Sequence, residues 1–452
     1  MSSTWVGSGA EVSAGGVATG GPLLPRKAGW FSKRFHWTDA VFTLLLLLGA
    51  GLGSHWYSSF MDVYEISILW SVVPVVAYLG YRWPSMKALC VSVAALTLLS
   101  IWSYGGDLKS AETRFFLKYL LSSQSAILWM GTMFVVATVS YWIGLLGRSE
   151  TSSFVGTALT WGGVVIGFAG MFIRWYESYL IGPDVGHIPV SNLYEVFVLF
   201  ALITALYYLF YEQVYKTRQL GAFVMLVVVA AVGFLAWYGV ERQAYAIQPL
   251  VPALQSWWMK IHVPANFIGY GTFSLAAMVA FAYLLKVYAD APSIKALLPT
   301  GALGVLMFLE PMVFRSGGIS PYWAVYFGVG CVVVGGILML RKRIASSLPP
   351  LEVLDDLMYK SIAVGFAFFT VATILGALWA AEAWGAYWQW DPKETWALVV
   401  WLNYAAWLHM RLVKGLRGVV ASYWALVGLL VTGFAFLGVN MFLSGLHSYG
   451  EL

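Results

Sequence analysis

The stretch LGAFVMLVVVAAVGFLAWY, residues Leu220–Tyr238, contains no charged side chain. Roughly 20 apolar residues in a helix are enough to cross the hydrocarbon core of a bilayer. Comparable runs occur at Ala40–Gly53 and Gly418–Leu437. Of the 452 residues, 60% are hydrophobic and 10% charged, against roughly 45–50% and 25% in soluble domains. The sequence therefore predicts an all-α, polytopic integral membrane helix bundle and excludes a water-soluble fold.

The apolar runs and their flanks predict about 13 transmembrane helices. We expect them near residues 38–57, 65–81, 86–104, 125–147, 153–173, 193–211, 219–240, 265–287, 299–314, 321–340, 360–383, 395–413 and 418–443. No loop between them is long enough for a soluble domain. Any chemistry must therefore be performed by short loops and helix ends.

The basic residues predict the orientation of the bundle. With the N-terminus in the cytoplasm, 18 of the 26 Lys and Arg residues fall on the inner side of the membrane. This places the C-terminus on the periplasmic side, and it accounts for the formal charge of +5 without a nucleic-acid partner. Residues 1–37 are expected to be a disordered cytoplasmic tail, because the first 24 lack the basic cluster and apolar core of a signal peptide.

Cysteine is scarce in this chain. Cys90 and Cys331 each lie inside an apolar run, and there is no Cys-x-x-Cys pair or metal-ligand spacing. We expect the protein to perform no thiol chemistry itself.

The segment 384–396 reads WGAYWQWDPKETW and is far richer in aromatic residues than the 17% of the whole chain. Isolated Trp residues gather at membrane interfaces, so an interfacial belt is the simplest explanation. Five aromatic residues interrupted by Gly and followed by a charged turn are better explained as a flat apolar platform for a large planar ligand. Asp391, Pro392 and Glu394 also form a strong helix-start signal, which Asn192 and Glu195 repeat elsewhere.

Histidine is the natural ligand for the iron of a planar macrocycle, and the chain has six. His262 and His447 stand in segments predicted to lie on the outer side, which is also the side of segment 384–396. Either residue alone is more simply an interfacial hydrogen-bonding group. Together they place two imidazoles beside the aromatic segment, which is the ligand set of a six-coordinate haem.

His409 lies within an apolar helix, about 14 residues and hence roughly 21 Å beyond Thr395. An ionisable residue at this depth is a functional candidate. The neighbouring Arg411 and Lys414 leave open that it is an interfacial residue at the inner edge. Of the remaining histidines, His36 and His55 are expected at the interface, and His187 either contacts a ligand or caps a turn in an outer loop.

Segment 384–396 resembles the tryptophan-rich (WWD) motif of haem-handling membrane proteins, in the form carried by the CcsA (ResC) family of system II cytochrome c biogenesis. The resemblance extends from about Ser125 to the C-terminus. It includes Arg174-Trp175, Pro189 to Glu195, His262-Val263 with Tyr270, Leu402 to Arg411, Gly438 to Asn440 and Gly445 to Gly450.

The resemblance implies the haem-binding subunit of a cytochrome c haem lyase. Such a subunit takes haem b from the cytoplasmic side and holds it at the outer face between His262 and His447. There it is presented to apocytochrome c for thioether attachment at Cys-x-x-Cys-His. The resemblance assigns haem contacts to Trp384, Trp388, Trp390, Asp391 and Trp396.

His409 corresponds in the family to a ligand of an earlier haem site within the membrane, and the resemblance supplies its partner ligand from a CcsB (ResB) subunit. The other implied partners are thiol-reducing proteins of the pathway and the lipid bilayer. The expected location is a bacterial inner membrane with the active site facing the periplasm, in preference to a thylakoid membrane.

Two regions lie outside the eight-helix core associated with the family. We expect residues 38–124 to form an N-terminal extension of three helices, and residues 125–452 to form the haem-handling domain with an extra hairpin at about 290–343. Three alternatives are a system I haem-delivery protein, against which the Lys393–Trp396 sequence argues, a transporter of another substrate, and a scaffolding subunit. A haem absorption spectrum separates the leading interpretation from the last two.

Overall fold

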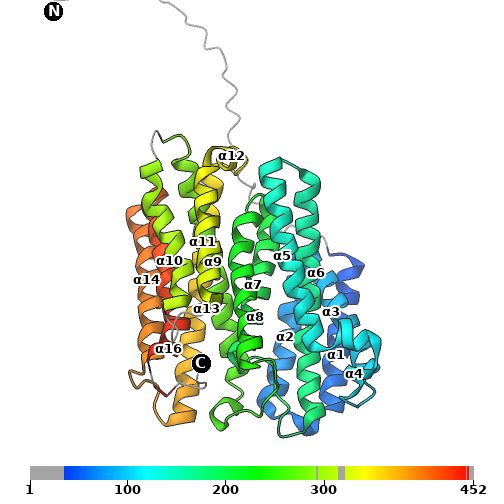
Figure 1. The fold of residues 1–452 in the computed structure, drawn as a ribbon. Helices are drawn as coiled ribbons and strands as arrows, with labels where there is room; N and C mark the ends of the chain where they lie inside the picture. Colours follow the sequence, from blue (N-terminus) through cyan, green and yellow to red (C-terminus); the bar gives the residue numbers. More distant parts are fainter. Residues whose placement is uncertain (1–34, 292–293, 314–320, 444, 447–452) are drawn as a thin grey trace, which may run out of the picture.

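A computed structural model of the protein describes residues 35–291, 294–313, 321–443 and 445–446, and every element within these ranges is helical. Figure 1 shows long helices running side by side in a bundle. This confirms the predicted all-α, polytopic architecture. Residues 1–34, part of the predicted hairpin and His447 lie outside the described residues.

The long helices are α1 (Trp37–Trp56), α2 (Val63–Arg82), α3 (Pro84–Tyr104), α5 (Ser123–Gly147), α6 (Glu150–Ile181), α7 (Leu193–Tyr215), α8 (Gly221–Arg242), α9 (Met259–Val287), α10 (Leu298–Val313), α11 (Pro321–Met339), α13 (Leu351–Trp384), α14 (Pro392–Lys414) and α15 (Gly418–Gly433). The short ones are α4 (Ser110–Thr113), α12 (Arg341–Ala345) and α16 (Val439–Phe442), the 3-10 helices η1 (Ser58–Phe60), η3 (Pro252–Gln255) and η4 (Ile294–Leu297), and the π-helices η2 (Leu117–Leu121) and η5 (Phe434–Gly438).

Eleven helices of the described chain are long and apolar enough to cross a membrane. The two other predicted spans are the helices α10 and α14. α10 is shorter, with 16 residues. α14 has 23 residues, but Asn403, His409 and Arg411 interrupt its apolar sequence. The prediction of about 13 spans therefore includes α10, which does not meet the length requirement, and α14, which does not meet the requirement for apolar composition.

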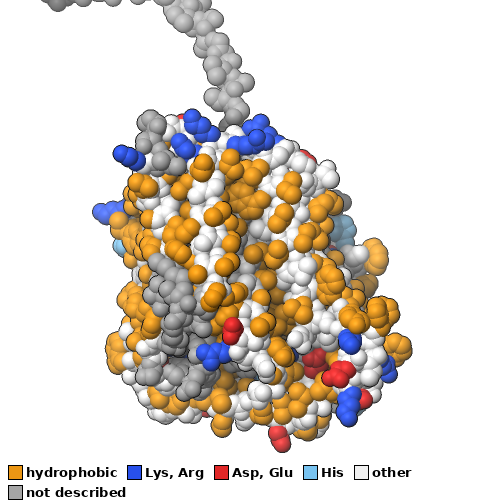
Figure 2. Space-filling view, viewed as in Figure 1, with side chains coloured by type: hydrophobic (Ala, Val, Ile, Leu, Met, Phe, Trp, Pro, Cys, Tyr) orange, Lys and Arg blue, Asp and Glu red, His pale blue; other side chains and the backbone are white. Residues whose placement is uncertain are grey.

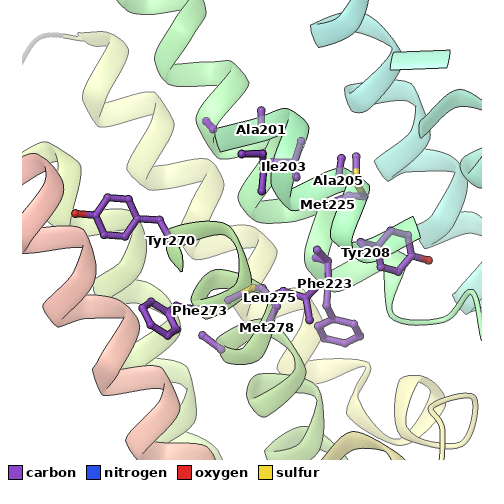
Figure 3. Close-up of a cluster of buried hydrophobic side chains, with 14 of the residues drawn as sticks. Ala201, Ile203, Ala205, Tyr208, Phe223, Met225, Tyr270, Phe273, Leu275 and Met278 are labelled. Atoms are coloured by element: carbon purple, nitrogen blue, oxygen red, sulfur yellow. The ribbon is translucent and has the colours of Figure 1, made fainter. Parts of the chain in front are cut away.

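α9 is the central helix of the bundle. In its most apolar window 94% of the residues are buried, against 17% in α1. Small residues allow close packing: a Cβ at Gly365 of α13 would lie 2.5 Å from the hydroxyl of Thr272. Figure 3 shows Tyr270, Phe273 and Met278 of α9 packed among side chains of neighbouring helices. α9 is thus a rigid element on which a functional side chain can be held.

The N-terminal helices α1, α2 and α3 form the edge of the bundle, and α3 packs against α6. The contact includes the buried carboxylate of Glu177, which accepts a hydrogen bond of 2.5 Å from the Tyr104 hydroxyl. The backbone nitrogen of Ser123 donates to the same carboxylate at 2.9 Å. The N-terminal extension is therefore anchored to the helices that follow it.

The two ends of the bundle differ in charge. Figure 2 shows apolar side chains along the flanks and a cluster of Lys and Arg side chains at the end where Figure 1 places α12. Arg341, Lys342 and Arg343 of α12 belong to this basic end. The loop between α13 and α14 lies at the opposite end. Segment 384–396, which contains this loop, is called the Trp loop below, and this end of the bundle is called the Trp-loop end. The positive-inside rule predicts that the basic end faces the cytoplasm.

Candidate functional site

His262 lies in the first turn of α9, at the Trp-loop end. We expected the span to begin near residue 265, so the helix starts six residues earlier than its apolar stretch. The reason is that apolarity marks the membrane-buried part of a helix, whereas backbone hydrogen bonding continues into the flank: the amide of His262 donates to the Trp258 carbonyl at 2.9 Å. His262 is therefore held by regular helical structure.

The imidazole ring of His262 is oriented by helix α13. Its Nδ1 lies 2.8 Å from the backbone carbonyl of Ala372. A carbonyl only accepts, so Nδ1 must carry the proton. The Nε2 lone pair is then the one that can bind a metal, and a hydrogen bond of this kind is typical of metal-binding histidines.

The walls around His262 are formed by Gly376 and Trp379 of α13. A Cβ at Gly376 would come within 2.8 Å of the His262 Cε1 atom, so only glycine allows the ring its position. The Trp379 ring stacks on the imidazole, with centroids 6.2 Å apart and planes 25° apart. Trp379 was missed in the sequence because it lies inside an apolar helix and outside segment 384–396.

Three tryptophans of the Trp loop take part in two edge-to-face pairs, one of them with Trp379 of α13. Trp384, the last residue of α13, meets Trp379 at 4.9 Å with an interplanar angle of 62°. Trp388 meets Trp390 at 6.0 Å and 87°. The predicted aromatic cluster therefore exists, but these rings do not lie in one plane. A flat platform is not the arrangement that tertiary packing produces.

Trp390 and Trp396 have different surroundings. Trp390 has a positive φ of 60° and is 69% exposed, so its ring projects from the turn. Trp396 packs against Phe434 of η5 with ring centroids 4.2 Å apart. Trp396 therefore joins the loop to the π-helix, and Trp390 is the more accessible of the two.

The predicted helix start at Asp391 is confirmed. The Asp391 carboxylate caps α14, its Oδ1 accepting from the Lys393 amide at 2.9 Å. Glu394 completes the capping box by accepting from the amides of Gln389 at 2.7 Å and Asp391 at 3.2 Å. Both carboxylates are buried.

The second oxygen of Asp391 has a role that the sequence did not indicate. Oδ2 accepts a hydrogen bond of 2.6 Å from the amide of Leu446. A Cβ at Gly445 would collide with the same carboxylate, so the chain passes close to Asp391 at this point. Asp391 therefore ties the C-terminal segment to the Trp loop, one residue before His447.

Lys393 follows Asp391 in the first turn of α14 and is half-buried. Burial lowers the pKa of its ammonium from 10.5 to about 8, and the nearby Asp391 carboxylate opposes this shift. The Trp loop thus contains a cation that is readily neutralised. An added anionic group would stabilise its charged form.

The N-terminal extension reaches the segment that precedes His262. Glu65 of α2 forms an ion pair with Lys260. The Tyr64 ring stacks on Trp257, with centroids 4.6 Å apart and planes 3° apart. These contacts join a region outside the resemblance to the start of α9.

His409 lies away from this site. It is exposed on α14, and the neighbouring Arg411 forms an ion pair with Asp355 of α13. The count from Thr395 places His409 roughly 21 Å along the helix. An exposed imidazole on the outside of the bundle is accessible to lipid or to another chain.

His187 is part of a separate buried cluster. Its Nδ1 lies 2.6 Å from the Val185 carbonyl, and its Nε2 lies 4.0 Å from the Glu195 carboxylate. The same carboxylate accepts from Arg174 Nε at 2.8 Å. This arrangement matches the turn-forming alternative for His187 that the sequence left open.

Comparisons with known proteins show the family to which this chain is similar. Residues 190–447 match the family described as cytochrome C assembly protein. The chain is 33% identical over 321 residues to the cytochrome c biogenesis protein CcsA of Chlorella vulgaris, covering 70% of this chain and 93% of that protein. It is 34% identical over 280 residues to the protein of the same name from Parasynechococcus marenigrum (strain WH8102), covering 62% of this chain and 81% of the relative.

Proposed function

The chain belongs to the cytochrome c assembly protein family, and we propose that it is the haem-binding subunit of a cytochrome c synthase. The family match and the apolar helices make it a multi-pass membrane protein of cytochrome c biogenesis. The finer proposal rests on one observation above all. The His262 ring is held by the Ala372 carbonyl in the tautomer that leaves Nε2 able to bind iron.

Both the position and the protonation of His262 suit it to act as an axial ligand of haem iron. It is half-buried at the Trp-loop end, against Trp379, which in turn contacts Trp384. Aromatic surfaces favour a large planar ligand through apolar burial. We assign haem contacts to Trp384, Trp388 and Trp390, and a supporting role to Trp396 because it packs against Phe434.

We assign the second axial position to His447, which lies outside the described residues. The hydrogen bond from Leu446 to Asp391 supports this assignment, because it holds the preceding residue at the Trp loop. Asp391 thus acts as a positioning residue for the C-terminal ligand. Haem held by two neutral imidazoles is six-coordinate, and a histidine of the incoming partner can replace one of them.

Lys393 supplies the complementary charge for haem. Haem carries carboxylate side chains, and the half-buried ammonium of Lys393 lies in the first turn after the aromatic pairs. Pairing with a carboxylate stabilises the charged form of a buried lysine. We therefore assign Lys393 to a haem carboxylate.

The chemistry proposed for the site needs haem, two reduced thiols and no oxidant. Each S–H of a Cys-x-x-Cys-His segment adds across one vinyl group, so that sulfur bonds to one carbon and hydrogen to the other. The residues of this chain hold haem, orient it and present its vinyl edge. Apocytochrome c is the acceptor, and thiol-reducing proteins of the pathway keep its cysteines reduced.

His409 is proposed as a ligand of a second, inner haem site. Its exposure on the outer surface of α14 suits a site completed by another chain, for which a CcsB-like membrane subunit is the candidate. With the basic end in the cytoplasm, His409 lies toward the side from which haem b enters, and His262 toward the periplasm. The corresponding location is a bacterial inner membrane.

The experiment that tests the proposal measures holocytochrome c in cells whose own copy of the gene is replaced. Replacing His262 or His447 by Gly should abolish covalent haem attachment, and added imidazole should restore part of it. His55→Ala, which changes an exposed histidine of α1, is the matched control and should leave maturation unchanged. Normal holocytochrome c with both His262 and His447 replaced would refute the proposal.

The inner site is tested separately with the partner subunit present. His409→Ala should reduce the haem bound at the outer site while the protein remains folded and inserted. Haem added from outside should then refill the outer site, since His262 is unchanged. Full haem occupancy in His409→Ala without added haem would show that His409 is an interfacial residue only.

A further inference from the structure

A partly open cavity of about 190 Å³ lies between helices of the bundle, and none of the residues assigned to haem lines it. Its walls come from α7, α8, α9, α10, α11, α15 and η5. All of these helices except α10 belong to the candidate membrane spans. The cavity therefore lies at the level of the hydrocarbon core of the bilayer.

The lining of this cavity is apolar and rich in aromatic rings. Figure 3 shows three of the side chains that line it, Phe223, Tyr270 and Met278, within the buried core. Of the residues that line the cavity in the described chain, none is charged and none is histidine. A ligand with carboxylates would find no cationic partner there, and haem iron would find no imidazole.

Two polar groups of the lining are engaged in hydrogen bonds to the backbone, whereas the buried indole Nε1 of Trp323 has no hydrogen-bond partner in the described structure. The Tyr322 hydroxyl donates to the Gly233 carbonyl at 2.6 Å. The Thr432 hydroxyl donates to the Gly428 carbonyl at 2.7 Å. A charged ligand would lose its hydration on entering the cavity and would gain no partner of opposite charge there.

The lining is elongated along the helix axes. On α9 it extends from Tyr270 to Phe281, a distance of about 16 Å at 1.5 Å per residue. On α8 it extends over the same length, from Phe223 to Phe234. The cavity is therefore elongated along the bundle, and it is called the channel below. An elongated apolar space suits a hydrocarbon chain.

The helices α10 and α11 form one wall of the channel. Gly304 and Phe308 of α10 and Tyr326 of α11 line it. The opposite face of α11 carries Val325 and Val329, which are exposed and apolar. Only this hairpin therefore separates the channel from lipid on that side of the described structure.

The inner wall contains the π-helix η5. Phe436 and Leu437 of η5 line the channel, next to Gly433 at the end of α15. π-Helical turns are rare, and those that occur are frequently found at functional sites. Here the irregular turn shapes the wall of the channel.

We propose that this channel binds one acyl chain of a membrane phospholipid between the α10–α11 hairpin and α9. An apolar cavity of about 150 Å³ stays dry and takes up apolar molecules, so a channel of this size in the membrane takes hydrocarbon in preference to water. The bound chain fills the space between the hairpin and the haem-handling helices. The proposal gives the hairpin a role and does not depend on the proposed function at the Trp loop.

The test uses the full chain in nanodiscs that contain phosphatidylcholine with a photoreactive diazirine on one acyl chain. After illumination, peptide mass spectrometry locates the adducts. The expected result is adducts on Phe281 and Trp323, whose side chains are 5% and 1% exposed, in addition to adducts on the outer surface. Adducts confined to outward residues such as Val325, Val329 and Val332 would overturn the proposal.

Two variants fill the channel and one serves as a matched control. Ala230→Phe and Ser274→Leu enlarge side chains that line it, and each should remove most of the adduct on Phe281 and Trp323. Ala236→Phe makes the same change as the first variant at an exposed position of α8 and should leave the adducts unchanged. Persistence of the internal adducts in both filled variants would contradict the proposal.

A competition arm distinguishes lipid from haem. Saturating the wild-type protein with haem should leave the internal adducts unchanged, because the lining offers no cation for the haem carboxylates and no histidine for the iron. Displacement of the photoreactive lipid by haem would mean that the channel belongs to the haem path. That result would overturn the lipid proposal without affecting the assignment of His262.

Discussion

The carboxylate of Asp391 accepts a hydrogen bond of 2.6 Å from the amide of Leu446, although the two residues are 55 positions apart in the sequence. The other carboxylate oxygen of Asp391 caps α14. One buried side chain therefore both begins the helix after the Trp loop and fixes the C-terminal segment beside it. This double use gives Asp391 a role beyond that of a helix cap.

The first prediction concerns Asp391→Asn. The Lys393 and Leu446 amides bind different oxygens of the carboxylate, and in asparagine an NH2 group, which donates only, replaces one of them. Loss of one buried acceptor costs about 1–3 kcal/mol. We expect a folded, inserted protein whose C-terminal segment is released and whose haem content is reduced, measured by the haem absorbance per protein after purification.

The matched control for Asp391→Asn is Glu394→Gln. The Glu394 carboxylate accepts from the Gln389 and Asp391 amides through a single oxygen, Oε2. The amide oxygen of glutamine can replace it, so haem content should remain close to that of the wild type. Equal haem content in Asp391→Asn and the wild type would show that the Leu446 contact is dispensable.

The second prediction concerns Gly376, which provides the space for the His262 ring. The Cβ of an alanine at 376 would lie 2.8 Å from His262 Cε1 and would displace the ring from the Ala372 carbonyl. Overpacking of this kind costs about 1–3 kcal/mol, so haem affinity should fall about tenfold or more. Titration of haem into the detergent-solubilised variant measures this change.

Gly336→Ala is the control for Gly376→Ala. A Cβ at Gly336 on α11 would meet no atom within 4 Å, so the same chemical change should leave haem affinity unchanged. If both glycine variants bind haem like the wild type, the position of the His262 ring does not determine binding.

The third prediction is a pH dependence caused by Lys393. The pKa of its ammonium is lowered to about 8 in the folded protein, below its unfolded value of 10.5. Between these values the unfolded state binds more protons, so the stability of the haem-free protein should rise as the pH increases through this window. Lys393→Met should remove this rise, whereas Lys109→Met, at an exposed position, should preserve it.

Haem binding should have the opposite pH dependence. If Lys393 pairs with a haem carboxylate, affinity falls as the ammonium loses its proton above about pH 8. Haem titrations at a series of pH values measure the effect, and Lys393→Met should flatten it. An unchanged slope in Lys393→Met would exclude the assigned pairing.

The success of the sequence-based predictions depended on how local each feature is. The cap formed by Asp391 and Glu394 was predictable because its partners lie within one helical turn. The apolar runs located the 13 long helices of the described chain, of which eleven are long and apolar enough to cross a membrane. The edge-to-face geometry of Trp388 and Trp390 depends on how the loop packs, and aromatic density does not indicate it.

The contacts that define the candidate site join distant parts of the chain. His262 and the Ala372 carbonyl are 110 residues apart, and no local pattern marks a backbone carbonyl as a partner. Tyr64 and Trp257 likewise join α2 to the segment before α9. The sequence could therefore nominate His262, whereas its tautomer and its surroundings required the fold.

The central claim is that His262 binds haem iron through Nε2, and the most direct measurement is the reduced absorption spectrum of the purified protein. The wild type should show the sharp bands of haem with two histidine ligands. His262→Gly should lose them, and imidazole should restore them by occupying the vacant position. A His262→Gly protein with the unaltered wild-type spectrum in the absence of imidazole would contradict the claim.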